Sequence, residues 1–290
     1  MKAAYLGPKA TFTDMAVQSA FPYIETRPYM TIPDCMRAVE NKEVHIAVVP
    51  LENALEGSVN LTIDYLFHEV NLPIVAEIIV PIQQHLMVHR DHALNWQQVE
   101  KILSHSHAIA QCHKYLHREF PHATLEQTTS TAAAAKFVSE HPEMKIAAIA
   151  NKAAAQKYQL DIVEKNIHDY SFNHTRFIVL SNLSTDVQIA LDAQTEKTTM
   201  MLTLPKNRSG ALHQVLSAFA WRNIDLSKIE SRPLKTGLGD YFFIIDINQK
   251  MDEVLLPNAI TEIETLGCTV KVLGSYCSYA LPPSNGFKKG

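Results

Sequence analysis

The sequence lacks the features that mark several common classes of protein. Its four cysteines are scattered without a CxxC pair, and no apolar run approaches the roughly 20 residues that span a bilayer. The first residues include no apolar stretch of signal-peptide length. With 26 Lys and Arg against 30 Asp and Glu, the net charge of −4 provides no basic field for nucleic acid or an anionic membrane. We therefore expect a cytoplasmic protein with reduced thiols and without nucleic-acid or membrane partners.

Glycine is also scarce, because Gly7 and Gly57 are the only glycines among the first 200 residues. Each lies directly before a predicted helix. A strand that passes through Gly, Ser or Thr into a helix N-terminus is a common anion-binding arrangement, since free backbone N–H groups and the helix dipole face the ligand. Ordinary turn chemistry is the alternative interpretation of both positions.

The composition, 47% hydrophobic and 19% charged, is that of a globular protein, and 290 residues suit two domains. Short apolar runs such as His45–Val49 alternate with helical patterns through the first 180 residues. Thr31 and Ser130 are predicted N-caps, and Ala108–Phe120 is predicted as one long helix. This alternation predicts an α/β fold with mainly parallel sheets, in two lobes with a ligand cleft at the strand ends.

The pattern changes in the last third of the chain. Thr198–Leu204 is predicted as a strand and Ser209–Arg222 as an amphipathic helix, followed by two strands joined by a loop at Lys235–Asp240, a helix and a last strand. This βαββαβ order is ferredoxin-like. The predicted boundaries are a first domain at 1–183 (lobes 1–78 with 172–183, and 79–171), a linker at 184–197, a second domain at 198–278 and a tail at 279–290.

Four segments of the first domain resemble the prephenate dehydratase family. Val49–Gly57 (VPLENALEG) is similar to the family pattern VPxENxxEG, and Asn173–Phe177 (NHTRF) to NxTRF. Gly7–Thr13 resembles GPxGTFT, and Ser104–Cys112 resembles SHxQALxQC. The resemblance implies a bilobal catalytic domain similar to type II periplasmic binding proteins. It also implies a lyase that removes water and carbon dioxide from prephenate to give phenylpyruvate, in phenylalanine biosynthesis and without a cofactor.

The resemblance makes Thr175 the essential hydroxyl, placed to donate to the departing oxygen. Because a threonine hydroxyl is a weak acid, Glu52 is the alternative proton donor, provided that a desolvated cleft raises its pKa. Arg176 is predicted either to grip a substrate carboxylate or to form a structural ion pair that holds the lobes together. Phe177 is expected to pack. The remaining predicted substrate-binding residues, each of which also suits a turn or helix cap, are Thr11, Asn53, Gly57, Ser104, His105, Ser130, Thr131 and Asn151.

Three positions depart from the family patterns. Ala10 replaces a glycine, so we expect its turn to avoid positive φ; His107 replaces glutamine, and His213 replaces valine. The 14 histidines include His113 and His117 at i, i+4, but without an HExxH motif or a cysteine partner we predict no metal site.

The last third resembles an ACT domain of the phenylalanine-binding type, through the motifs GAL and ESRP. The resemblance implies feedback inhibition by L-phenylalanine, bound between paired domains of a homodimer or homotetramer. The predicted effector-binding residues are Gly210, Ala211, Leu212, Asn223, Leu226, Glu230, Ser231, Arg232 and Pro233. Alternatives are a domain used only for dimerisation, an arogenate dehydratase, and a non-catalytic amino-acid-sensing protein.

Overall fold

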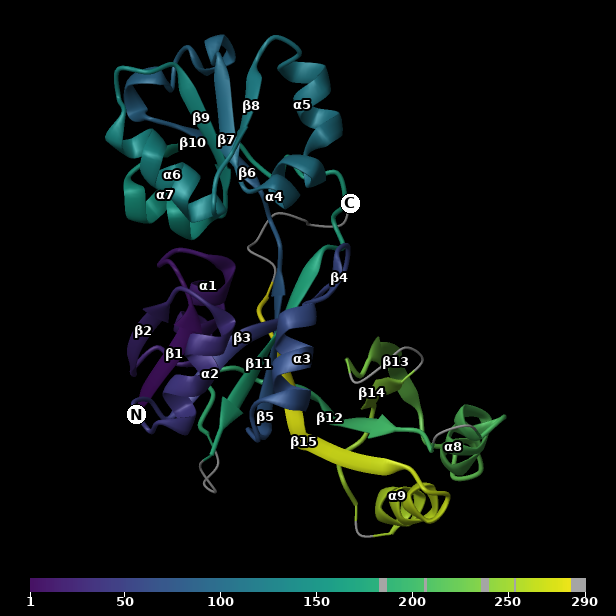
Figure 1. Cartoon of the computed structure of the whole chain (residues 1–290). Coiled ribbons are helices and arrows are strands. Elements are labelled where there is room, and N and C mark those ends of the chain that lie inside the picture. Colours follow the sequence, from purple (N-terminus) through teal and green to yellow (C-terminus); the bar gives the residue numbers. More distant parts are fainter. Residues whose placement is uncertain (183–186, 206–207, 236–239, 253, 283–290) are drawn as a thin grey trace.

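A computed structural model of the chain describes residues 1–182, 187–205, 208–235, 240–252 and 254–282. It contains three bodies, which we call lobe 1, lobe 2 and the C-terminal unit (Figure 1). Lobe 2 lies at one end of lobe 1, and the C-terminal unit lies against the side of lobe 1. No helix in the described ranges is long and apolar enough to cross a membrane.

Lobe 1 is a mixed sheet with helices on both faces. Its strands are β1 (Lys2–Leu6), β2 (Glu25–Tyr29), β3 (Ile46–Asn53), β4 (Gly57–Ser58), β5 (Ile74–Pro81) and β11 (His174–Ser181), and its helices are α1 (Phe12–Ala20), α2 (Ile32–Glu40) and α3 (Asn60–His68). β2, β1 and β3 run parallel, whereas β11 is antiparallel to both β3 and β5. The expectation of mainly parallel sheets is therefore wrong for this lobe, because β11 enters from lobe 2 and runs against its neighbours.

Lobe 2 is a smaller sheet with the strand order β10-β6-β9-β7-β8. Its elements are β6 (His85–Val88), β7 (Lys101–Ser104), β8 (Thr124–Gln127), β9 (Ile146–Ala150), β10 (Asp161–Glu164), α4 (Ser106–Gln111), α5 (His113–Glu119), α6 (Thr131–Glu140) and α7 (Lys152–Tyr158). The predicted single helix Ala108–Phe120 is two helices, because Cys112 leaves the helical conformation at the junction. Both helices still pack on one apolar cluster through Ala108, Cys112 and Leu116.

The C-terminal unit has the predicted βαββαβ order. Its elements are β12 (Ala193–Thr203), α8 (Ala211–Ala220), β13 (Leu226–Pro233), β14 (Tyr241–Ile247), α9 (Leu255–Thr265) and β15 (Thr269–Ala280). The strand order β13-β14-β12-β15 places β14 and β12 in the centre of the unit and its last strand, β15, at the edge beside β5. Most of the predicted loop Lys235–Asp240 and the tail beyond Pro282 lie outside the described residues.

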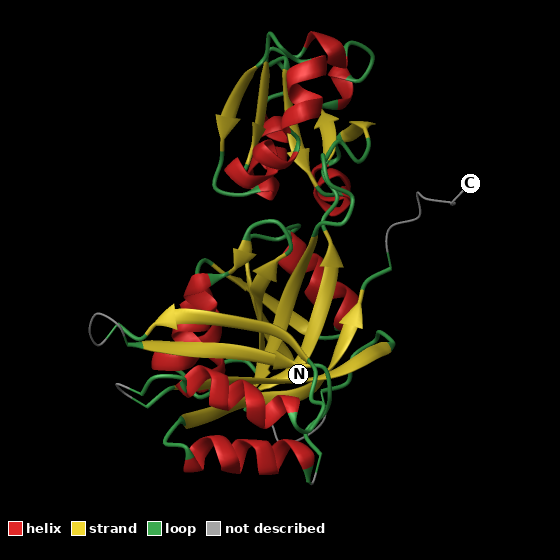
Figure 2. Ribbon diagram, turned by 90° about the vertical axis from the view of Figure 1, so that its right-hand side faces the viewer, coloured by secondary structure: helices red, strands yellow, loops and turns green. Residues whose placement is uncertain are grey.

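The C-terminal unit and lobe 1 share one continuous sheet (Figures 1 and 2). The last residues of β15 pair in parallel with β5, with Tyr279 opposite Ile78. Gly274 permits the crossing, because a Cβ there would lie 2.1 Å from the Ile74 carbonyl oxygen. The structure thus differs from the predicted boundaries: β12 begins inside the predicted linker, at Ala193, and β15 extends past 278.

Candidate active site between the lobes

A cleft of about 720 Å³ lies between lobe 1 and lobe 2. Lobe 1 contributes the ends of β1 and β3, the start of β11 and the turn at Gly57, and lobe 2 contributes the starts of α4 and α6. The chain crosses between the lobes after β5 and before β11, so that Ile82 and Gln84 line the crossing. The predicted catalytic residue Thr175 lines the cleft, together with the predicted substrate-binding residues Thr11, Asn53, Gly57, His105, Ser130, Thr131 and Phe177.

Thr175 lies in the lobe 1 wall of the cleft and is 9% exposed. It pairs with Asn53 across β11 and β3, and Asn53 Nδ2 donates a hydrogen bond of 2.9 Å to Thr175 Oγ1. The same amide group donates to Asn173 Oδ1 and to the His174 carbonyl oxygen, so its orientation is fixed. Because Thr175 Oγ1 accepts this bond, its own O–H remains available as a donor toward the cleft.

Arg176 and Glu52 face the opposite side of the sheet and do not line the cleft. Arg176 Nη1 lies 2.6 Å from Glu52 and 2.8 Å from Asp246, and Nη2 lies 2.5 Å from Glu77. Successive side chains of a strand point to opposite faces, so Thr175 and Arg176 cannot both reach the cleft. In this structure the guanidinium forms a structural ion pair, but this pair joins lobe 1 to the C-terminal unit through Asp246 and not one lobe to the other.

Glu52 does not meet the condition set for a proton donor. Burial acts to raise its pKa, but hydrogen bonds and charges from Lys228 and Arg176 outweigh burial, and the pKa is lowered. The expectation of a raised pKa is therefore wrong. The carboxyl group of this motif that does line the cleft is Glu56, to which Gln111 Nε2 donates across the cleft at 3.4 Å.

Two helices of more than two turns begin at the cleft, one from each lobe. Thr11 caps α1 by accepting from Asp14 N, and Ser130 caps α6 by accepting from Ala133 N. The predicted capping roles of Thr31 and Ser130 are confirmed. No lysine or arginine is found among the described residues that line the cleft. Anionic groups of a ligand would therefore meet helix N-termini, hydroxyls and imidazoles.

The turn before α1 contradicts one prediction. Ala10 has φ 66°, so it adopts the left-handed conformation that we expected it to avoid. Local bonds hold it there: its N–H donates to Asp14 Oδ2 at 2.6 Å, and its carbonyl accepts from Asn151 Nδ2 at 3.0 Å. These contacts offset the roughly 1–2 kcal/mol that an L-residue loses in this conformation.

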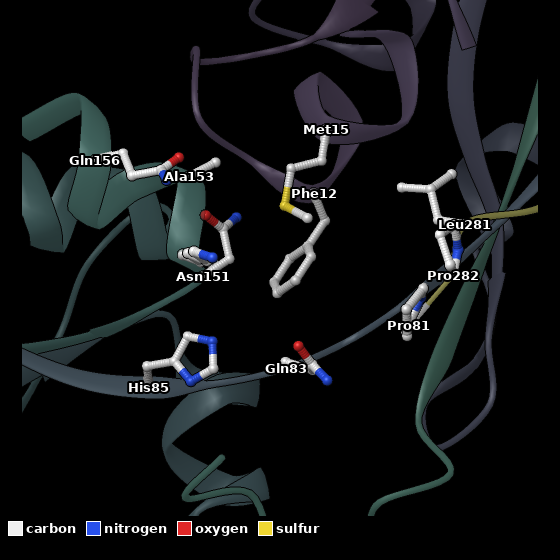
Figure 3. Close-up of a pocket in the computed structure, with 11 residues that line it drawn as sticks. Phe12, Met15, Pro81, Gln83, His85, Asn151, Ala153, Gln156, Leu281 and Pro282 are labelled. Atoms are coloured by element: carbon white, nitrogen blue, oxygen red, sulfur yellow. The ribbon is translucent and has the colours of Figure 1, made fainter. Parts of the chain in front are cut away.

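Asn151 and Ser104 lie outside the main cleft. Asn151 caps α7 and lines a second pocket of about 230 Å³ on the other face of the crossing segment, where Phe12, Met15 and Gln83 extend into the same space (Figure 3). Ser104 is fully buried and donates to the Ile149 carbonyl oxygen. Their placement favours roles in joining lobes and strands over contact with substrate.

Gln84 and Gln111 line the cleft but were not among the predicted site residues. Both side chains are more than nine-tenths buried, and their Oε1 atoms have no hydrogen-bond partner among the described residues. Buried polar atoms are nearly always paired, so these two amides suit a polar ligand. Gln111 belongs to a motif that the sequence displays, whereas nothing in the sequence around Gln84 marks it.

Replacing Asn53 with aspartate is expected to lower the kcat of a reaction that uses the Thr175 hydroxyl by about 100-fold, the scale of losing one positioned donor. The substituted carboxylate accepts rather than donates, so it would capture the Thr175 proton. Steady-state kinetics test this, with Asn41→Asp on the surface at the end of α2 as control. A change of less than threefold in N53D would contradict the assigned hydrogen bond.

The predicted effector-binding residues do not form one cluster within a single chain. Gly210, at φ 77°, begins α8 with Ala211 and Leu212, whereas Asn223 and Leu226 follow its other end. Glu230 and Arg232 instead contact lobe 1, through Ser58 and Asp64. Ser231 and Pro233 are exposed on the other face of β13.

The chain is similar to known proteins over nearly its whole length. The family model described as prephenate dehydratase matches residues 3–185. The prephenate dehydratase of Bacillus subtilis strain 168 is 59% identical over 286 residues, covering 97% of this chain and 100% of the relative. That of Lactococcus lactis subsp. cremoris strain MG1363 is 44% identical over 282 residues, covering 97% and 99%.

A solved structure described as prephenate dehydratase in complex with L-Phe, from Arthrobacter aurescens, has a TM-score of 0.83 and 30% identity, covering 95% of this chain and 90% of that one. The class is therefore a lyase of α/β fold. The chain belongs to the prephenate dehydratase family.

Proposed function

We propose that the cleft converts prephenate to phenylpyruvate, with the Thr175 hydroxyl donating to the ring hydroxyl as it departs. The observation that carries the proposal is the Asn53–Thr175 hydrogen bond, which leaves the threonine proton facing the cleft. The bond between the ring and its carboxylate carbon breaks as the ring carbon–oxygen bond breaks. The carboxylate leaves as carbon dioxide, and the electron pair of its bond to the ring completes the aromatic system while the oxygen departs. Hydroxide takes up a proton and leaves as water.

Glu56 is the candidate source of that proton, because no other described residue that lines the cleft has a carboxyl side chain. The substrate carboxylates are assigned to the N-termini of α1 and α6, near Thr11 and Ser130–Thr131. Gln84, Gln111 and His105 would hydrogen-bond the remaining oxygens, and Phe177 would pack against the ring.

Turnover of purified protein on prephenate and arogenate tests the substrate. We expect phenylpyruvate from prephenate at a rate well above that of phenylalanine from arogenate. Turnover of arogenate alone would change the substrate assignment. Binding without turnover of either compound would indicate a sensing protein and remove the enzymatic proposal.

We further propose that the C-terminal unit is an ACT domain that binds L-phenylalanine between two copies of the chain. Helix α8 has 10 residues and so spans about 15 Å, which separates Gly210 from Asn223 within one chain. A second copy would bring the two groups of residues together, consistent with a homodimer or homotetramer. The L-Phe complex of the Arthrobacter relative supports the effector.

Millimolar L-phenylalanine is expected to inhibit the wild-type enzyme at least tenfold, whereas Gly210→Val should escape inhibition. Valine is strained at φ 77°, so the start of α8 would lose its geometry. Initial rates and calorimetric titration measure the effect. Ser209→Ala, next to the turn at Gly210, is the matched control. Gly57→Val would not serve as a control, because that substitution alters the cleft. Equal inhibition of wild type and G210V would oppose the site.

We propose a cytoplasmic location and the two-lobed arrangement of type II periplasmic binding proteins for the catalytic domain. The two chain crossings, at 82–84 and 165–173, support that arrangement. We also place the catalytic domain at about 1–182 and the regulatory domain at 193–280, so that both share the sheet through β15 and β5.

A further inference from the structure

The hairpin formed by β3 and β4 supplies one wall of the cleft. Glu52 pairs with Ser58, and Asn53 pairs with Gly57 across the hairpin. Asn53 carries the hydrogen bond to Thr175, while Gly57 and Ser58 line the cleft directly. The position of this hairpin therefore affects both the binding wall and the orientation of the reacting hydroxyl.

Lys228, on β13 of the C-terminal unit, joins the two sides of that hairpin from behind. Its Nζ lies 2.9 Å from Glu52 Oε1 and donates to Ser58 Oγ at 2.6 Å. The lysine side chain is 10% exposed. One largely buried ammonium group thus bridges two residues that face each other across the hairpin.

Glu230, two residues further along β13, completes the contact. Ser58 Oγ donates to Glu230 Oε2, and Lys228 Nζ lies 3.3 Å from the same oxygen. The hydroxyl of Ser58 accepts from one residue of the C-terminal unit and donates to another, so both of its bonds fix it from outside lobe 1.

We infer that Lys228 is a positioning residue for the dehydratase site, acting through Glu52 and Ser58, with Glu230 in support. This inference rests on the proposed function of the cleft. The C-terminal unit then supports the active-site wall from behind even when no effector is bound. A displacement of about 1 Å in such a wall is enough to cost up to 100-fold in rate.

Lys271 provides a matched control. It also crosses from the C-terminal unit to lobe 1, where its Nζ donates to the carbonyl oxygens of Leu66 at 2.7 Å and Val70 at 3.1 Å. These carbonyls lie at the far end of α3 and do not line the cleft. Both lysines thus hold the same interface, but only one contacts the hairpin.

The experiment compares Lys228→Met, Lys228→Arg and Lys271→Met with wild type on prephenate without phenylalanine. We expect K228M to raise KM about tenfold and to lower kcat by a smaller factor. K228R should have a KM within threefold of wild type. K271M should keep the wild-type values of both KM and kcat. Thermal unfolding of each variant reports the shared interface.

Ser58→Ala keeps the inference testable if K228M does not fold, because it removes the bridged hydroxyl without leaving a buried charge. It should raise KM by about fivefold. Equal kinetic effects of K228M and K271M, or a wild-type KM in K228M or S58A, would overturn the inference. Failure of wild type to turn over prephenate would instead remove the proposed function itself.

Discussion

Replacing Arg176 with methionine is expected to lower the free energy of unfolding by about 3–5 kcal/mol, the cost of leaving buried carboxylates without their partner. Glu77 is fully buried and Asp246 nearly so, and the guanidinium contacts both. Lys197 Nζ, 2.9 Å from Glu77, compensates only in part. Urea unfolding at neutral pH measures the loss.

Arg118→Met is the matched control for this loss. Arg118 also pairs with a glutamate, but the pair lies on the surface of α5 with side chains 68% and 44% exposed. Exposed pairs contribute little, so we expect Arg118→Met to unfold almost as wild type does. A similar loss in the two variants would contradict the role of the buried network.

The loss in R176M should also depend on pH. Burial acts to raise the pKa values of Glu52 and Glu77, but positive neighbours outweigh it, and both lie below the ordinary 4.5. Groups with lowered pKa values stabilise the fold above their unfolded pKa, and that stability is lost as the pH falls through the folded pKa. The difference between wild type and R176M should therefore be full above pH 4.5 and shrink on acidification.

The second large effect is catalytic. Thr175→Val is expected to lower kcat on prephenate by about 1,000-fold, within the range for loss of a positioned donor or acid. Valine has nearly the shape of threonine, so the cleft should keep its form. The lost bond from Asn53 costs about 1 kcal/mol of stability. Circular dichroism and thermal unfolding separate that small change from the loss of rate.

The sequence alone was sufficient for the motifs, and for most helix starts, because capping and strand patterns are local. The helix caps Thr31 and Ser130 and the βαββαβ order of the C-terminal unit follow from such local patterns. Strand alternation could also have sorted the site residues. Thr175 and Arg176 are neighbours in the sequence, so in an extended segment only one of them can face the cleft, as in β11.

The remaining features of the fold and of the candidate site depend on contacts between residues far apart in the chain. Gln84 becomes a cleft residue only because the chain crosses between lobes at that point. Lys228 lowers the pKa of Glu52 from a strand that starts more than 170 positions later. The conformation of Ala10 depends on a bond from Asn151 in lobe 2. No local pattern carries such information.

The most direct measurement is the initial rate of phenylpyruvate formation from prephenate by T175S and T175V, compared at equal folded fraction. Serine preserves a hydroxyl at the centre of the cleft and valine does not. We predict that T175S stays within about tenfold of wild type while T175V falls about 1,000-fold. Rates that are equal in the two variants and close to wild type would contradict the placement of the reaction at this hydroxyl.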